Sequence, residues 1–500
     1  MSKPIKSGFR GNVNITFVHT PMAAITVPER ELFWRNFDIQ YHAAHPGLPH
    51  MVNNLWELPH WMHWLAGVLV AEGFTQLRTL DFYTSQTALS GIDRQDVSRT
   101  LSQHEADVYL FSPMTPNIDF AYQIAEVIKS LYPRSVIVFG GVMATPLHRE
   151  VAGHPAVDYV VSDRGEFALP NLLKTLQDRG DITKVGNLTY KASDGNVRTN
   201  PMRYPYPAVE KIPFPKIDLF PQSVGQDIRY LRVVHALGCP YKCPYCTIQT
   251  IGRKANYFPI ERVLAEIRAY RGYYGEHHNI YFGDETFTLH PAHTIEFCAA
   301  LEEEGGIYYD CQTRLNCLTD VDIIKALARS GCRWVEVGLE TDNQESLNLY
   351  KQGMKLSPTE EVLKRLRDEG LAACSFMVNG FPNQTLDDMK RSTDWICSLI
   401  QRDLLQGSYL QVLVPYPGSD MYENPVKYGM KLLHHDYRYY SEDMPPVFDS
   451  ELAKSDDVYK QFQRGLTSIA QAMAKKPYFG NLPPVENLDK YGAFWSDSHI

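Results

Sequence analysis

Three cysteines stand close together near the middle of the chain, at Cys239, Cys243 and Cys246. Their spacing is C-x3-C-x2-C. Iron–sulfur clusters are held by cysteine thiolates, usually four of them. Three neighbouring thiolates can bind three irons of a cubane and leave the fourth iron open to a ligand from outside the protein. Pro240 and Pro244 disfavour a regular helix, so the segment is expected to form a loop.

The other cysteines help to separate a cluster from other uses of thiols. The chain has nine cysteines and none before Cys239, which argues against a disulfide framework. Zinc could use three cysteines and a histidine, but no second short C-x2-C or H-x3-H motif accompanies these three. The remaining cysteines are expected to be small buried side chains, although Cys311 and Cys317 come near the end of a predicted strand. This group is Cys298, Cys311, Cys317, Cys332, Cys374 and Cys397.

The cysteine loop follows the first strand of a repeating strand–helix pattern that begins at Arg229. About six such units predict a partial barrel of parallel strands. Active sites in barrels of this kind gather at the carboxyl ends of the strands. The predicted strands are 230–235, 279–282, 307–311, 334–338, 373–378 and 409–414, and the predicted helices are 259–274, 291–304, 320–330, 360–369 and 386–400.

On this cysteine motif and its barrel context, residues from about 229 to 422 resemble the radical S-adenosylmethionine (SAM) superfamily. The resemblance implies a [4Fe-4S] cluster on Cys239, Cys243 and Cys246. It also implies that the amino and carboxylate groups of SAM chelate the open iron. An electron from an external flavodoxin- or ferredoxin-type donor then cleaves SAM to methionine and a 5′-deoxyadenosyl radical.

Further residues match positions at which this family holds SAM. Tyr245 matches the aromatic residue that supports adenine, and either Asp284 or Glu285 matches a polar contact to the SAM amino group. Thr313, Arg314 and Glu340 close the next two strands and match positions that hold ribose or carboxylate groups. These roles are physically reasonable, because a guanidinium grips a carboxylate through two parallel bonds and a carboxylate suits an ammonium group. We also expect Tyr409, Gln411 and Tyr416 to line the wall of the substrate site.

The first part of the chain shows a second alternating pattern. It predicts a doubly wound parallel sheet with flavodoxin-like strand order. Ligands of such sheets bind beyond the carboxyl ends of the strands. The predicted strands are 14–19, 77–83, 107–112, 135–139 and 157–161, and the predicted helices are 59–73, 119–131 and 166–177.

Loops at these strand ends suggest a ligand. Paired glycines at Gly140 and Gly141 let a bulky group approach the backbone, while the G-x-G-x-x-G dinucleotide fingerprint is absent. Residues 12–177 resemble the cobalamin-binding domain found ahead of many radical SAM domains. The resemblance implies cobalamin with its nucleotide tail in a slot at the strand ends. Since no Asp-x-His-x-x-Gly motif occurs, it implies no histidine beneath the cobalt. The implied contacts are Thr20, Pro21, Ser112, Met114, Thr115, Gly140, Gly141, Val142, Gly165 and Glu166.

The remaining segments divide the chain into regions. We predict a cobalamin-binding Rossmann-like domain over 1–178, a linker over 179–228 with a hairpin at Asp194-Gly195, the radical SAM barrel over 229–426 and a small C-terminal region over 427–500. An aromatic-rich insertion spans 23–58 and holds Trp34 and Trp56. It is either a functional connection or a structural flap with its own small core. The C-terminal region is expected to pack on the barrel mouth or on the first domain.

Net charge and hydropathy restrict the partners and the cellular location that we expect. A net charge of −9 argues against nucleic acid as a partner. No signal peptide or membrane-spanning stretch is found, so we expect a cytoplasmic protein with no membrane partner. Together with the resemblances, this indicates a cobalamin-dependent radical SAM methyltransferase. One SAM would methylate reduced cobalamin, and a second would supply the radical that prepares a carbon of a small molecule, by default a secondary metabolite, for the methyl group.

Three other readings compete with methyl transfer. Both cofactors could serve a cyclisation, oxidation or rearrangement without methylation. A methylthiotransferase is less well supported, because that class carries a second cluster on cysteines ahead of the radical motif and this chain has none there. A redox or metal-sensing binding protein would never form 5′-deoxyadenosine.

Overall fold

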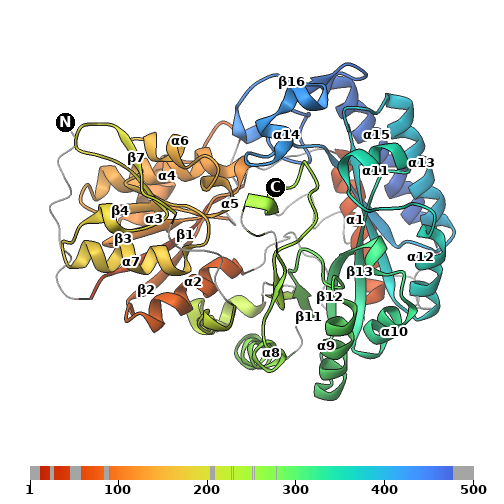
Figure 1. Cartoon of the computed structure of the whole chain (residues 1–500), viewed down its shortest axis with the longest axis horizontal. Helices are drawn as coiled ribbons and strands as arrows, with labels where there is room; N and C mark the ends of the chain where they lie inside the picture. Colours follow the sequence, from red (N-terminus) through yellow and green to blue (C-terminus); the bar gives the residue numbers. More distant parts are fainter. Residues whose placement is uncertain are drawn as a thin grey trace.

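The computed structural model describes residues 12–22, 28–45, 58–83, 89–202, 209–226, 228, 230–250, 252, 254–276 and 279–476. Two α/β units lie side by side, and each is built on its own parallel sheet (Figure 1). The doubly wound first unit, the partial barrel and the small C-terminal region are confirmed.

The first sheet has the order β2-β1-β3-β4-β5 over its parallel strands, which is the flavodoxin-like order predicted. Four-residue apolar runs such as Val136–Phe139 are buried completely, as expected for strands covered on both faces. The strands are β1 (Ile15–His19), β2 (Leu77–Asp81), β3 (Val108–Phe111), β4 (Val136–Phe139) and β5 (Tyr159–Val161). The helices are α2 (His60–Ala71), α3 (Arg94–Leu101), α4 (Ile118–Leu131), α5 (Gly141–Ala144), α6 (His148–Gly153) and α7 (Gly165–Gln177).

The hairpin predicted in the linker is present as β6 (Leu188–Lys191) and β7 (Val197–Thr199). It does not stand apart, because β6 pairs antiparallel with β5 and extends the first sheet to seven strands. Asp194 accepts a hydrogen bond from Asn196 N, and Gly195 has a φ of +85°, so local turn chemistry sets the register.

The second sheet has six parallel strands in the order β8-β11-β12-β13-β14-β15. Gly331 and Gly370 follow its helices with φ of +94° and +79°, as C-caps require. The strands are β8 (Tyr230–Val233), β11 (Asn279–Phe282), β12 (Tyr309–Arg314), β13 (Cys332–Glu340), β14 (Ala372–Asn379) and β15 (Gly407–Val412), and β9 (Ala236–Leu237) pairs with β10 (Asn256–Tyr257) beside them. The helices are α8 (Ile260–Tyr274), α9 (Pro291–Glu304), α10 (Val321–Arg329), α11 (Gln344–Tyr350), α12 (Thr359–Asp368) and α13 (Leu386–Gln401).

The described part of the insertion is a helix, α1 (Pro28–Ala44), which corrects the reading as a flap with its own core. Although β1 and α2 belong to the first unit, α1 lies against the second (Figure 1). Its buried side chains Phe33, Phe37 and Tyr41 are part of the main hydrophobic core. Tyr41 donates to Asp310 on β12, and His45 lies 2.7 Å from the same carboxylate. Trp56 lies outside the described residues.

The region after residue 427 contains a 20-residue helix, α15 (Ser455–Ala474), that the sequence analysis did not predict. α15 packs on α1, α13 and β15. The same region holds the hairpin of β16 (Met430–Leu432) and β17 (Phe448–Ser450), and the short helix α14 (Asp420–Glu423) lies just ahead of it. Residues 437–439 contact the first unit, where Tyr437 donates to Glu150 and Arg438 donates to the carbonyl of Leu89. The region therefore contacts both units, whereas the sequence analysis expected packing on the barrel mouth or on the first domain.

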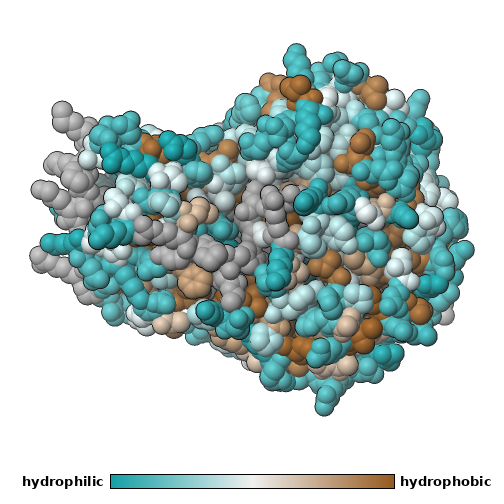
Figure 2. All heavy atoms as spheres, viewed as in Figure 1, coloured by the Kyte–Doolittle hydropathy of each residue, from teal (hydrophilic) through white to brown (hydrophobic). Residues whose placement is uncertain are grey.

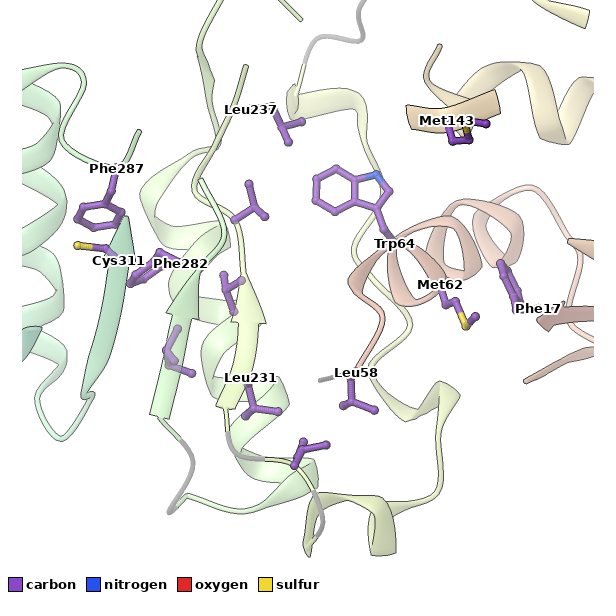
Figure 3. Close-up of a cluster of buried hydrophobic side chains, with 14 of the residues drawn as sticks. Phe17, Leu58, Met62, Trp64, Met143, Leu231, Leu237, Phe282, Phe287 and Cys311 are labelled. Carbon is purple, nitrogen blue, oxygen red and sulfur yellow. The ribbon is translucent and has the colours of Figure 1, made fainter. Parts of the chain in front are cut away.

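One hydrophobic core runs through the boundary between the units. Figure 3 shows Leu58 and Trp64 of the first unit facing Leu231 and Leu237 of the second. Trp64 also packs edge-on against Phe258, with ring centroids 5.3 Å apart. On the face seen in Figure 2, hydrophilic residues predominate and hydrophobic ones are scattered. Among the described residues, no helix combines the length and the apolar character needed to span a bilayer.

Candidate active site

The three cysteines line a pocket of about 200 Å³ at the carboxyl ends of the barrel strands. Cys239 and Cys243 are buried, and Cys246 is partly buried. Gly238 has a φ of +93°, and a Cβ there would lie 2.5 Å from the carbonyl oxygen of Lys254, so the loop needs glycine. Burial raises the pKa of Cys239, and it raises that of Cys246 to about 12. Iron must displace protons from these thiols, because the thiolate is the ligand form.

Most of the other residues expected near SAM line the same pocket. Tyr245, Glu285, Thr313, Arg314 and Glu340 all do so. The sequence analysis missed several residues of this pocket. Two of them, Gln312 and Gly338, lie two positions before Arg314 and Glu340 on the same strands, so strand alternation could have indicated them. These further lining residues are Tyr241, Ile248, Thr286, Gln312, Gly338, Lys351 and Phe376.

The structure separates the two acidic candidates after β11. Asp284 is buried and points at the backbone, where it accepts hydrogen bonds from the N–H groups of His235 and Ala236. Glu285 lines the pocket and accepts from Gly238 N over 3.0 Å. Burial raises the pKa of the Glu285 carboxyl. Of the pair, only Glu285 is placed to reach a ligand in the pocket.

Glu340 is held by a local irregularity of β13. It has a φ of +66°, which is rare for a residue other than glycine, and the β13–β14 register shifts between Gly338 and Glu340. Its carboxylate forms a buried ion pair with Lys351. Gly338 leaves room for this ion pair, since a Cβ at that position would lie 2.3 Å from Lys351 Nζ. Such strain at a strand end is typical of functional positions.

A second cavity of about 380 Å³ lies inside the barrel and shares Gln312 and Phe376 with the cysteine pocket. Its walls are the inward positions of the strands together with α1. Of the expected substrate-wall residues, Tyr409 and Gln411 line this inner chamber. Tyr416 is not among its lining residues and donates instead to Glu442 over 2.5 Å.

A third cavity, of about 300 Å³, lies at the strand ends of the first sheet. Six of the expected contacts line it: Ser112, Gly140, Gly141, Val142, Gly165 and Glu166. The other four, Thr20, Pro21, Met114 and Thr115, are not among its lining residues. The cavity is completed by His60, Trp61 and Trp64 of α2 and by Val234 and Leu237 of the second unit, which the sequence analysis did not assign.

Comparisons with known proteins agree with this geometry. The model of the Radical SAM superfamily matches residues 233–396, and that of the B12 binding domain matches residues 57–173. The chain is a radical SAM enzyme with a B12-binding domain. An uncharacterized methyltransferase of Pyrococcus horikoshii is 25% identical over 380 residues, which cover 75% of this chain and 81% of the relative. An anaerobic magnesium-protoporphyrin IX monomethyl ester cyclase of Rubrivivax gelatinosus is 24% identical over 383 residues, covering 73% and 66%.

A solved structure shares the fold of both domains of this radical SAM enzyme. The methyltransferase TsrM from Kitasatospora setae, with cobalamin and a [4Fe-4S] cluster bound, superposes with a TM-score of 0.63 at 15% identity and covers 90% of this chain and 82% of its own. The enzyme uses a [4Fe-4S] cluster, SAM and cobalamin.

The residues of the B12-binding domain fit its cofactor. Gly141 has a φ of +88°, and a Cβ there would lie 2.2 Å from Ser112 Oγ, so this cavity wall needs glycine. Glu166 accepts from Trp64 Nε1 over 3.1 Å with one oxygen. Its other oxygen is buried, and within the described residues it has no hydrogen-bond partner. An acceptor of this kind suits an amide donor on a ligand.

Proposed function

We propose that this enzyme transfers a methyl group from SAM to a carbon of a small-molecule substrate and that cobalamin carries the methyl. The adjacency of the two cofactor sites is the main support. Val234 and Leu237, just ahead of Cys239, line the B12-binding cavity, and α5 of the first domain contacts the turn at 247–250 that follows the cysteine loop. Burial raises the pKa of Glu285 in the SAM pocket, and the charge of Arg164 in the B12-binding cavity is close enough to offset a small part of that rise. The name of the Pyrococcus horikoshii relative supports the same activity.

Roles follow for the residues around SAM. Cys239, Cys243 and Cys246 would hold the cluster, and Arg314 would grip the SAM carboxylate. Glu285 rather than Asp284 would accept from the SAM amino group. Glu340 and Thr313 would hold ribose hydroxyls, and Tyr245 would support the adenine.

The B12-binding domain would hold the nucleotide tail between Gly140-Gly141 and α2, with Glu166 accepting from an amide. When bound, the three cofactors supply the one-electron cleavage of SAM and the carriage of the methyl group. The protein's part is to orient the reacting groups and to exclude water. A flavodoxin- or ferredoxin-type protein would provide the electron.

A second candidate keeps the cofactors without methylation. The Rubrivivax gelatinosus relative is named a cyclase, and its name supports ring formation on a substrate radical. The two reactions differ in product mass, because only methylation adds a CH2 unit from SAM.

The test uses anaerobically reconstituted full-length protein, a chemical reductant, cobalamin and SAM with a trideuterated methyl group. Methyl transfer predicts 5′-deoxyadenosine, S-adenosylhomocysteine and deuterium in the extracted cobalamin fraction. A cyclase predicts 5′-deoxyadenosine with no deuterium in that fraction. Cys243→Ala should abolish 5′-deoxyadenosine, and Cys397→Ala, far from the pocket in sequence and on α13, serves as the matched control.

A further inference from the structure

The inner chamber is lined by one set of strand positions. Side chains alternate along a strand, so every second residue faces the same side. The chamber contains Arg232 of β8, Tyr281 of β11, Gln312 of β12, Glu336 of β13 and residues of β14 and β15. Gln312 and Phe376 also line the SAM pocket. A molecule in the chamber would therefore lie next to the SAM pocket.

Flat aromatic rings make up much of the wall. Tyr230 and Tyr281 lie 5.1 Å apart between ring centroids, and Phe376 and Tyr409 lie 5.2 Å apart and stack at 22°. Trp34 of α1 adds a ring 6.0 Å from that of Tyr409. Rings at these separations leave faces that favour a planar, π-rich guest. The cavity of about 380 Å³ limits that guest to a compact molecule.

Glu336 places a carboxyl group in this aromatic wall. It is 6% exposed and accepts from the Tyr281 hydroxyl over 2.8 Å and from the Tyr409 hydroxyl. A carboxylate offers about four acceptor positions, so two remain after these phenols. Burial raises the pKa of Glu336 to about 7, and a bound cation would offset that cost.

The two arginines of the chamber contact other chamber residues, and the charge of Arg232 also lowers the pKa of Glu336 against the larger effect of burial. Arg30 forms an ion pair with Asp443 at 2.7 Å. The guanidinium of Arg232 lies 4.7 Å from the ring centroid of Tyr281. Asp310 is bonded to Tyr41 and His45 of the α1 region. Glu336 is the chamber carboxylate whose hydrogen-bond partners are the aromatic side chains of Tyr281 and Tyr409.

We propose that the inner chamber binds the substrate and that this substrate is a compact aromatic amine, with its ring against Tyr281, Phe376 and Tyr409 and its nitrogen donating to Glu336. The inference rests on the proposed function, because it takes the molecule in the chamber to be what the radical attacks. A charge-assisted hydrogen bond to a buried carboxylate would fix the orientation of the ring.

Binding of three small probes tests this without turnover. 2-Phenylethylamine carries the ring and the ammonium, 2-cyclohexylethylamine lacks the aromatic ring, and 3-phenylpropanoate carries the opposite charge. Ligand-observed NMR on the cofactor-loaded protein should rank 2-phenylethylamine above both others. Glu336→Gln should weaken 2-phenylethylamine roughly tenfold or more and should not weaken 3-phenylpropanoate. Glu336→Asp should keep part of the preference for the amine.

The control is Glu302→Gln, a surface carboxylate paired with Arg329, which should bind all probes like the wild type. Equal or tighter binding of 3-phenylpropanoate to the wild type would overturn the inference, as would an unchanged amine affinity in Glu336→Gln. Thermal melting of each variant separates lost binding from lost folding. Formation of 5′-deoxyadenosine without amine binding would reject the substrate class alone. Amine binding without any 5′-deoxyadenosine would reject the proposed function instead.

Discussion

Arg314 lies between Cys243 and Tyr241. Its Nη1 donates to Cys243 Sγ over 3.4 Å, its guanidinium carbon lies 3.7 Å from the Tyr241 ring centroid, and Nη2 donates to the Gln352 carbonyl over 2.6 Å. The end of β12 thus fixes the cysteine loop. One side chain links the proposed cluster site to the proposed SAM carboxylate site.

Arg314→Lys should separate cluster binding from SAM binding. Lysine keeps the charge but loses the planar fork that reaches several partners at once. The cluster should still assemble on the three cysteines, while 5′-deoxyadenosine formation should fall about tenfold or more. Iron and sulfide analysis together with single-turnover product analysis checks this. Wild-type SAM cleavage by the variant would contradict the assigned role.

Gly141→Ala should remove cobalamin without removing the cluster. The added Cβ would lie 2.2 Å from Ser112 Oγ at a φ of +88°, and the strain should cost about 1–3 kcal/mol. The matched control is Gly153→Ala, where a Cβ would meet nothing within 4 Å. Cobalt per protein in the purified enzyme should fall only in Gly141→Ala. Equal cobalt in both variants would show that cobalamin binds elsewhere.

Glu336 should make folding stability depend on pH. Its pKa is raised from 4.5 to about 7, chiefly by burial, while Tyr281, Tyr409, Asp310, Arg232 and Cys374 face it. Between these pH values the folded chain keeps a proton that the unfolded chain has lost. The free energy of unfolding should therefore fall by about 3 kcal/mol as pH rises from 4.5 to above 7.

Denaturant unfolding of the wild type and of Glu336→Gln checks this, because glutamine cannot ionise. The variant should gain stability relative to the wild type between pH 5 and pH 8. A constant difference across that range would mean that Glu336 titrates at its ordinary pKa.

Tyr41→Phe should loosen α1 from the barrel. The substitution removes the hydroxyl that donates to buried Asp310, and losing a hydrogen bond to a charged acceptor costs about 1.5–3 kcal/mol. Hydrogen exchange of the backbone amides of α1 should accelerate, while exchange in α4 of the first domain stays as in the wild type. Unchanged protection of α1 would show that apolar packing alone holds it.

Much of this arrangement could be predicted from the sequence because its signals are local. The cysteine spacing, the polar residues at successive strand ends and the period-two strands placed the SAM pocket. Helix α1 was missed although Phe33, Phe37, Tyr41 and Ala44 recur at helical spacing, since its partners lie more than 250 residues away on β12 and α15. The inner chamber depends on strand register and on α1, so no local pattern could reveal it.

The choice between Asp284 and Glu285 also depended on tertiary structure that the sequence does not show. Both follow β11 in sequence, and only the path of the chain turns Asp284 toward the backbone of His235 and Ala236. The four cobalamin contacts that do not line the cavity were assigned from their position after a strand. The distance between a strand end and a cavity depends on tertiary packing.

The central claim is that three cysteines hold the cluster and leave one iron for SAM. Electron–nuclear double resonance of the reduced cluster, with SAM labelled by 15N in its amino group, tests it most directly. The account predicts a 15N hyperfine coupling that appears only when SAM is added and is lost in Cys243→Ala. Two results would contradict it. One is a fourth iron that already carries a side-chain ligand, with no 15N coupling. The other is zinc bound by the three thiolates.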